Sequence, residues 1–270
     1  MTDKLFDIVI PLGKKDINLI YSQIKHTKKN ILNYNKIYII TSLDIQIDDC
    51  EIISENIFPF SLETIKLFHG NSDRHNWYFQ QLLKLYAGFI IPNIKDKYLV
   101  IDVDTFFLKP TSFIENNKCL YNYSFEYTIH YFNHSKRLLE NNDFNRNHLN
   151  FSGICHHMIF ETKFIKEIMD KIETKHNDKF YNIMLKLVNI NNKDELFSGF
   201  SEYELYFNYM INNHLNEITI RHLNYKDIYS LNEQTINSIL NYDYISIHTW
   251  FLDDPLNINL KKIVYKILDI

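Results

Sequence analysis

Residues 98–110 read YLVIDVDTFFLKP, an apolar run that ends in two aspartates separated by one valine. The run from Tyr98 to Asp102 predicts a buried β-strand. Alternate side chains of a strand point to the same face, so Asp102 and Asp104 are expected to project together while Val103 points into the core. Two adjacent carboxylates at the end of a buried strand repel each other unless a cation compensates them. Because carboxylate oxygens suit Mg²⁺ or Mn²⁺, the pair predicts a metal site.

The elements around this run predict an α/β fold. Phe6 to Pro11 and Lys36 to Thr41 are β-rich runs that flank a helical segment, Asn18 to Leu32, which is the order of a βαβ unit. Further helices are expected over residues 74–89, 163–174 and 202–213, and strands over 154–160 and 244–250. In open α/β sheets, ligands bind beyond the carboxyl ends of the strands, and the aspartate pair lies at such an end. No repeat or Gly/Ser/Pro-rich linker divides the chain, so residues 1–270 are expected to form one domain.

Composition narrows the class of partner. The 270 residues are 46% hydrophobic and 15% aromatic, which is enough for a large core. The formal net charge of −4 argues against nucleic acid as a partner, because proteins that bind it need excess Lys and Arg.

Cysteine usage and apolar patterning predict a cytoplasmic protein. Cys50, Cys119 and Cys155 form no CxxC motif, so neither a disulfide framework nor a structural zinc site is expected. Asp7 interrupts the first apolar run, unlike a signal peptide, and no run reaches the roughly 18 apolar residues of a membrane span. Residues 260–270 alternate lysines with aliphatic residues. They are expected to form a terminal helix docked on the domain, with peripheral membrane contact as the alternative.

The helix expected over residues 74–89 has a face that points to function. At about 100° per residue, one stripe contains Arg74, Trp77, Gln81 and Lys84. Arg74 and Lys84 suit a diphosphate or sugar hydroxyls, and Trp77 suits stacking on a sugar or base. The alternative is a solvated polar face whose tryptophan packs at the rim.

Four residues in the second half are further candidates. His156 and His157 are adjacent on an expected strand, so at most one faces the site, and the other is a core histidine. Ser201 to Glu204 reads as a capping box, in which Glu204 reaches back to the Ser201 amide. Glu202 is then the freer carboxylate and the candidate general base. Its alternative role is to stabilise the helix through the interaction of its charge with the helix dipole.

The chain resembles a glycosyltransferase-like family of bacteria and large DNA viruses. The resemblance rests on WYxQQLLKLY at residues 77–86, DxD at 102–104, GxxHHMIF at 153–160 and SEYExY at 201–206. It implies a GT-A fold, a Rossmann-like mixed sheet flanked by helices, with a nucleotide-binding half (1–110) and an acceptor-side half (111–270). It also implies that the Asp102-Val103-Asp104 segment binds Mn²⁺ or Mg²⁺ on the diphosphate of a nucleotide-sugar donor, UDP being the first donor expected. His156 and His157 stay candidates for donor binding on this resemblance.

His248 is the candidate third metal ligand. Several metal-dependent GT-A enzymes take this ligand from a histidine late in the chain, and His248 matches by position. It falls on the polar side of the strand expected over residues 244–250. An ordinary exposed histidine is the alternative.

The implied reaction is metal-dependent sugar transfer to an acceptor hydroxyl. Asp102 and Asp104 would hold the ion, which makes Asp104 catalytic through it, while Lys84 or Arg74 would assist with the leaving diphosphate. Glu202 would deprotonate the acceptor if configuration inverts and orient the sugar if it is retained. The stereochemistry and the acceptor stay open.

Two other classes stay open as well. An aspartyl phosphatase of the haloacid dehalogenase type would use Asp102 as the nucleophile, but its threonine stands two places after the second aspartate, whereas Thr105 follows Asp104 directly. A phosphohydrolase would also need another strand-end acid, for which Asp253-Asp254 is the candidate. The third class is a sugar-nucleotide-binding protein without turnover.

Overall fold

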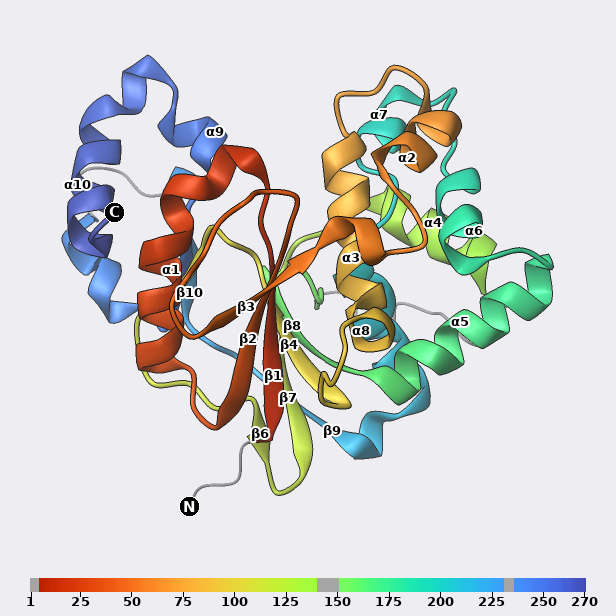
Figure 1. Ribbon diagram of the computed structural model, residues 1–270, viewed down its shortest axis with the longest axis horizontal. Helices are drawn as coiled ribbons and strands as arrows, with labels where there is room; N and C mark the ends of the chain where they lie inside the picture. The colour runs from red at the N-terminus through yellow and green to blue at the C-terminus, as the bar shows by residue number, and fades with distance from the viewer. Residues whose placement is uncertain (1–4, 140–150, 231–235) are drawn as a thin grey trace.

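The computed structural model describes residues 5–139, 151–230 and 236–270 and shows a mixed α/β fold (Figure 1). Its central sheet has the strand order β3-β2-β1-β4-β8. The parallel strands are β1 (Phe6–Pro11), β2 (Tyr34–Thr41), β3 (Cys50–Ser54) and β4 (Lys97–Ile101). β8 (His157–Glu161) pairs antiparallel with β4. The expected α/β class, with a mixed sheet flanked by helices, is therefore confirmed.

Helices cover both faces of the sheet. In Figure 1, α1 (Ile17–Asn30) and α10 (Ile258–Leu268) lie on one side. The other side carries α3 (His75–Ile90), α5 (Thr162–His176) and α8 (Glu202–Asn213). The shorter helices are α2 (Leu62–His69), α4 (Ile129–Leu138), α6 (Phe180–Lys186), α7 (Lys193–Phe197) and α9 (Thr249–Leu252).

Two small sheets extend the structure beyond β4. One has the order β10-β11-β5, formed by β10 (Tyr225–Asp227), β11 (Tyr244–Ser246) and β5 (Thr105–Phe107). The other has the order β6-β7-β9, formed by β6 (Ile114–Glu115), β7 (Lys118–Asn122) and β9 (Ile218–Arg221). Because β5 follows β4 after three residues, the first small sheet brings late segments of the chain next to the aspartate pair.

Two of the expected strands are shorter than the apolar pattern predicts. The strand expected over 154–160 begins at His157, because His156 has a left-handed backbone conformation with φ of 59°, which interrupts a strand. The strand expected over 244–250 ends at Ser246, and α9 begins at Thr249. Both breaks put a histidine just outside a strand.

The C-terminal helix packs on the domain. α10 buries Leu260, Val264 and Leu268, and the Ser22 hydroxyl in α1 donates a hydrogen bond to the Leu268 carbonyl. The expected docked terminal helix is therefore confirmed. Within the described ranges, no helix has both the length and the apolar character that crossing a bilayer requires.

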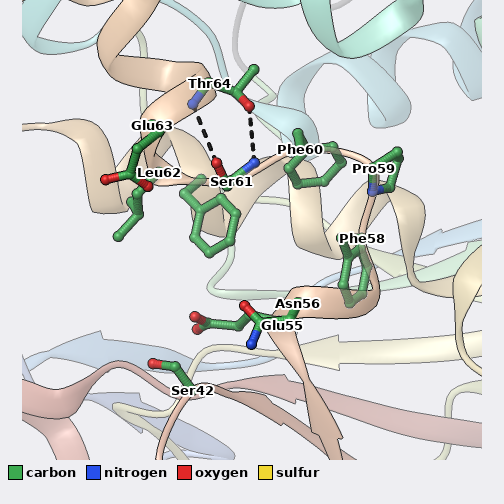
Figure 2. Close-up of a pocket in the computed structure, with 11 residues that line it drawn as sticks. Ser42, Glu55, Asn56, Phe58, Pro59, Phe60, Ser61, Leu62, Glu63 and Thr64 are labelled. Atoms are coloured by element: carbon green, nitrogen blue, oxygen red, sulfur yellow. Dashed lines mark hydrogen bonds between the residues drawn. The ribbon is translucent and has the colours of Figure 1, made fainter.

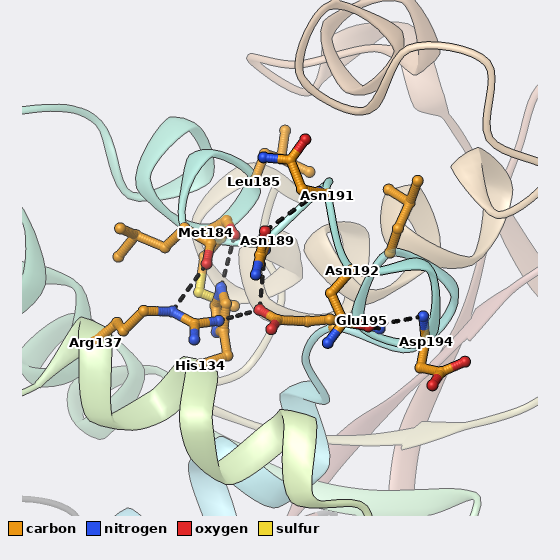
Figure 3. A network of polar contacts seen from close by, with 12 residues as sticks. His134, Arg137, Met184, Leu185, Asn189, Asn191, Asn192, Asp194 and Glu195 are labelled. Carbon is orange, nitrogen blue, oxygen red and sulfur yellow. Dashed lines mark hydrogen bonds and ion pairs between the residues drawn. The ribbon is translucent and has the colours of Figure 1, made fainter.

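A polar network joins α4 to the segment that leads into α7 (Figure 3). Arg137 donates to the Leu187 carbonyl at 3.0 Å and pairs with the carboxylate of Glu195. His134, which is fully buried, donates from Nε2 to the Met184 carbonyl at 2.8 Å. Burial lowers the pKa of His134 to about 3. The network thus holds a neutral histidine inside the protein.

This histidine predicts acid sensitivity. Its folded pKa of about 3 lies below the unfolded value of about 6.5, so the unfolded chain binds the proton first. The contribution of neutral His134 to the free energy of unfolding is fully present above about pH 6.5 and is lost progressively as the pH falls toward 3. Between pH 6 and pH 5 the wild type should lose about 1 kcal/mol more unfolding free energy than His134→Gln, measured by urea denaturation. The exposed His222→Gln variant should follow the wild type; the same behaviour in His134→Gln would contradict the assignment.

Candidate functional site

A cavity of about 490 Å³ lies at the C-terminal end of β4. Residues from α3, the aspartate turn, the loop before β8, the start of α8 and the segment after β11 line it together. Those with predicted roles are Arg74, Trp77, Gln81, Lys84, Asp102, Val103, Asp104, His156, Glu202 and His248. All but one of the predicted site residues therefore line one cavity.

The exception is His157, and its expected role at a donor site is wrong. Its ring is buried in the core, edge-on to Phe107, Phe113 and Tyr244. Burial lowers its pKa to about 3. Adjacent residues were expected to face opposite ways, and here His156 faces the cavity while His157 faces the core.

The two aspartates reach the cavity from a turn, not from a strand. β4 ends at Ile101, and the Thr105 N–H donates to the Asp102 carbonyl at 2.9 Å, which closes a tight turn between β4 and β5. The expected strand geometry is therefore wrong, although both carboxylates do line the same cavity. Val103 is buried at the same turn, as expected.

Lys84 is fixed between two carboxylates. Its Nζ lies 2.5 Å from Asp102 Oδ1 and 2.7 Å from Glu202 Oε1, and the side chains of Lys84 and Glu202 are almost wholly buried. The Tyr203 hydroxyl donates to Asp102 Oδ1 at 3.0 Å. Burial alone would lower the pKa of Lys84, but Asp102 and Glu202 outweigh it and raise that pKa. Lys84 is therefore a permanent buried cation.

The expectation of a free Glu202 carboxylate is wrong, because Glu202 is the partner of Lys84. Burial nevertheless raises the pKa of Glu202, whereas Lys84 and His156 hold the pKa of Asp102 well below its usual range against the effect of burial. Lys84 and His156 together therefore favour the ionised form of Asp102. Gln81 accepts the Glu202 backbone N–H at 3.0 Å and so supports the start of α8.

Asp104 carries the least compensated charge of the pair. Burial and the neighbouring charge of Asp102 raise the pKa of Asp104 to about 6. The nearest imidazole is that of His248, whose Nδ1 lies 3.8 Å from Asp104 Oδ2. A cation placed between these groups would relieve the repulsion.

The Ser201 cap is present, and Glu204 has a structural role with partners that the sequence did not indicate. Ser201 accepts the Glu204 N–H at 3.2 Å. The buried Glu204 carboxylate accepts the Ser152 hydroxyl at 2.6 Å and the Gly153 N–H at 3.0 Å. A Cβ at Gly153 would lie 2.3 Å from that of Phe207, so only glycine allows the loop to approach α8 this closely. Glu204 thereby anchors the loop that carries His156.

The polar face of α3 does point into the cavity, but two of its residues also contact each other. The Arg74 guanidinium lies over the Trp77 ring at 4.6 Å and donates from Nε to the Phe197 carbonyl at 2.9 Å. Trp77 stacks with Tyr131, which also lines the cavity. Arg74 therefore has a defined position at the cavity wall.

Asp227 is the main residue that sequence reasoning missed. It ends β10, and its Oδ1 lies 3.2 Å from His156 Nε2 and 3.7 Å from His248 Nε2. A strand-end acid is a usable signal, but β10 has only three residues and no alternating pattern. Asp253 and Asp254 were the acids expected in this position. Asp253 instead pairs with Lys261, and Asp254 accepts the Leu256 N–H and caps the turn there.

Glu126 and Tyr229 also line the cavity without having been predicted. Burial raises the pKa of Glu126. Neither residue lies in a motif, so no sequence signal pointed to them.

Two further hollows lie near the ends of the first strands. One, of about 710 Å³, follows β1 and shares Asp16, Arg74 and Trp77 with the site cavity. The other, of about 450 Å³, lies at the start of α2 (Figure 2). There Ser61 and Thr64 form a capping box, and no predicted site residue lines it. The hollow that follows β1 is therefore the natural extension of the site.

Comparison with known proteins places the chain in a family without naming an activity. Among curated proteins, none matches the chain. Residues 21–243 match DUF6492, a family of unknown function. Because that match covers most of the sequence, the protein belongs to the DUF6492 family.

Proposed function

We propose that this protein is a metal-dependent glycosyltransferase of the GT-A type that uses a nucleoside-diphosphate sugar, UDP-sugars being the first donors to test. The observation that carries the proposal is the convergence of Asp102, Asp104 and His248 in one cavity at the carboxyl ends of the parallel strands of the mixed sheet. Ligands of open α/β sheets bind at this edge. The adjoining cavity beyond β1 offers room for the nucleoside, and Arg74 lies on the wall that the two cavities share.

The donor atoms suit a divalent ion. Asp104 and the Oδ2 atom of Asp102 offer hard oxygens, and His248 offers a nitrogen beside Asp104. Burial and the charge of Asp102 raise the pKa of Asp104, so a cation beside Asp104 would favour its ionised form. When bound, the ion would neutralise charge that develops on the departing diphosphate.

The side chains divide the remaining work. Lys84 keeps Asp102 ionised, and Glu202 holds Lys84 in place. Arg74 stabilises diphosphate charge from the cavity wall. Glu126 suits the role of proton acceptor for an inverting transfer, because it lines the cavity and burial raises its pKa, which makes its carboxylate a stronger base. Glu202 can take that role only after leaving Lys84, and in a retaining transfer neither base is required.

Metal-dependent binding of UDP tests the proposal. Calorimetry with Mn²⁺ should show binding that weakens at least about tenfold, or about 1.4 kcal/mol, in EDTA and in Asp104→Ala. Asp48→Ala removes an exposed carboxylate outside the cavity and should bind as the wild type does. Equal affinity under all these conditions would rule out the proposed donor site. Where UDP binds, thermal shifts with a panel of nucleotide sugars identify the donor.

A metal-dependent phosphohydrolase is the second candidate, and Asp227 is the observation that favours it. Such an enzyme needs a further carboxylate beside the aspartate pair, and Asp227 contacts His156, which in turn faces Asp102. Hydrolysis of p-nitrophenyl phosphate with Mg²⁺, abolished in Asp102→Asn and without any affinity for UDP, would favour this candidate over sugar transfer.

A further inference from the structure

Three residues from distant segments meet beside the aspartate turn. Asp227 ends β10, His248 follows β11, and His156 precedes β8. β10 and β11 are parallel with Asp227 opposite Ser246, so the chain leaves both strands at the same edge. Ser246 in turn pairs with Thr105, and the Ile247 N–H donates to the Asp104 carbonyl at 2.8 Å. The small sheet therefore fixes Asp227 and His248 relative to the aspartate turn.

The third residue, His156, is held by its backbone. Its carbonyl accepts the Asp102 N–H at 2.9 Å, and its φ of 59° lies in the left-handed region. Such a conformation is costly for a residue with a side chain and persists where the surroundings impose it, often at functional sites. In this conformation the imidazole faces the cavity instead of continuing the strand.

The spacing of the donor atoms is that of ligands around one ion. Two tetrahedral ligand atoms bound at about 2.1 Å lie about 3.4 Å apart. His156 Nε2 and His248 Nε2 lie 3.2 and 3.7 Å from the same oxygen, Asp227 Oδ1. One donor atom from each of the three residues lies within 4.8 Å of the other two. The shorter of the two distances also suits a direct hydrogen bond, so the case for an ion rests on all three residues meeting at one point.

The opposite edge of each ring faces a carboxylate. His156 Nδ1 lies 3.8 Å from Asp102 Oδ2, and His248 Nδ1 lies 3.8 Å from Asp104 Oδ2. A histidine bound to a metal commonly directs its other N–H to a carboxylate, which sets the tautomer and the ring orientation. The two aspartates are placed to do this for both histidines, with Nε2 left for the ion.

We propose that His156, Asp227 and His248 form a binding site for a first-row transition-metal ion, with Asp102 and Asp104 as outer partners of the two histidines. Two nitrogens and one oxygen favour ions such as Co²⁺, Zn²⁺ or Mn²⁺ over Mg²⁺. The site binds the ion without a nucleotide, and the argument for it does not rest on sugar transfer, although it shares His248 with the proposed donor site. It uses the Nε2 side of His248, whereas an ion held by the aspartate pair would use the Nδ1 side.

Co²⁺ titration without nucleotide tests the site directly. Co²⁺ gives a visible absorption band that reports its coordination, and it shifts the proton NMR signals of bound imidazole N–H groups. The wild type should bind one Co²⁺ and show two shifted histidine N–H signals, because the carboxylates facing Nδ1 slow the exchange of both protons. His156→Gln and His248→Gln should each retain one signal, and Asp227→Asn should weaken Co²⁺ binding at least about tenfold.

Matched variants separate this site from the aspartate pair. Asp104→Asn keeps an oxygen facing His248 and should keep both signals, and the exposed His222→Gln should behave as the wild type does. A single shifted histidine signal that disappears in Asp104→Asn would overturn the proposal in favour of an ion on the aspartate pair. Undiminished Co²⁺ binding in Asp227→Asn, or no Co²⁺ binding by the folded wild type, would also overturn it. None of these measurements involves UDP, so failure of the proposed function leaves this test intact.

Discussion

Lys84→Met should lower the free energy of unfolding by about 3–5 kcal/mol, because it removes the cation between two buried carboxylates. Asp102 and Glu202 would then lie close together without the cation between them, and burial already disfavours the ionised form of each. The apolar stem of methionine fills most of the space that lysine occupies, so the loss reports charge and not a cavity. Urea denaturation followed by circular dichroism at pH 7.5 measures it.

Two further variants show whether the carboxylates cause this loss. Adding Glu202→Gln to Lys84→Met removes one of the two uncompensated charges and should restore part of the stability. Lys28→Met breaks the exposed pair with Asp49 and should cost no more than about 1 kcal/mol. An unfolding midpoint for Lys84→Met equal to that of the wild type would mean that the pair is not compensated as the structure indicates.

Local patterns predicted the elements that depend on neighbours in sequence. The β1 run is fully buried and apolar apart from Asp7, and α8 has the bounds that its cap and its periodicity predict. The polar stripe of α3 lines the cavity because helical spacing alone places Arg74, Trp77 and Lys84 on one side. These features need no information about distant parts of the chain.

The features that the sequence did not predict depend on contacts across the fold. Glu202 is 118 positions from Lys84 in the sequence, so a capping pattern gave no sign that it would be an ion-pair partner. His156 leaves the expected strand because its backbone adopts a left-handed conformation, which an apolar alternation does not reveal. Asp227 joins the site through the pairing of a three-residue strand, a length too short for any periodic signal. The errors therefore concern the partner of a side chain or the local backbone, and not the class of the fold.

Glu204→Ala should lower the free energy of unfolding by about 3 kcal/mol, more than the 0.5–2 kcal/mol expected for a lost helix cap. Its carboxylate accepts hydrogen bonds from the Ser152 hydroxyl and the Gly153 N–H, and both donor residues are buried. Hydrogen bonds to a charged group contribute about 1.5–3 kcal/mol each, and buried donors without a partner add a further cost. The change also releases the loop that positions His156.

The neighbouring acid gives the matched comparison, because Glu202 and Glu204 lie in the same turn of α8 and have different partners. Glu204→Gln keeps an accepting oxygen and should recover part of the stability that Glu204→Ala loses. Glu202→Gln should unfold closer to the wild type, since Lys84 keeps Asp102 as a partner, but it should lower turnover once a donor and acceptor are found. Urea denaturation of the three variants, paired with UDP calorimetry, separates the two roles. If Glu204→Ala kept the wild-type midpoint and lost donor binding, Glu204 would be the functional carboxylate and Glu202 the structural one.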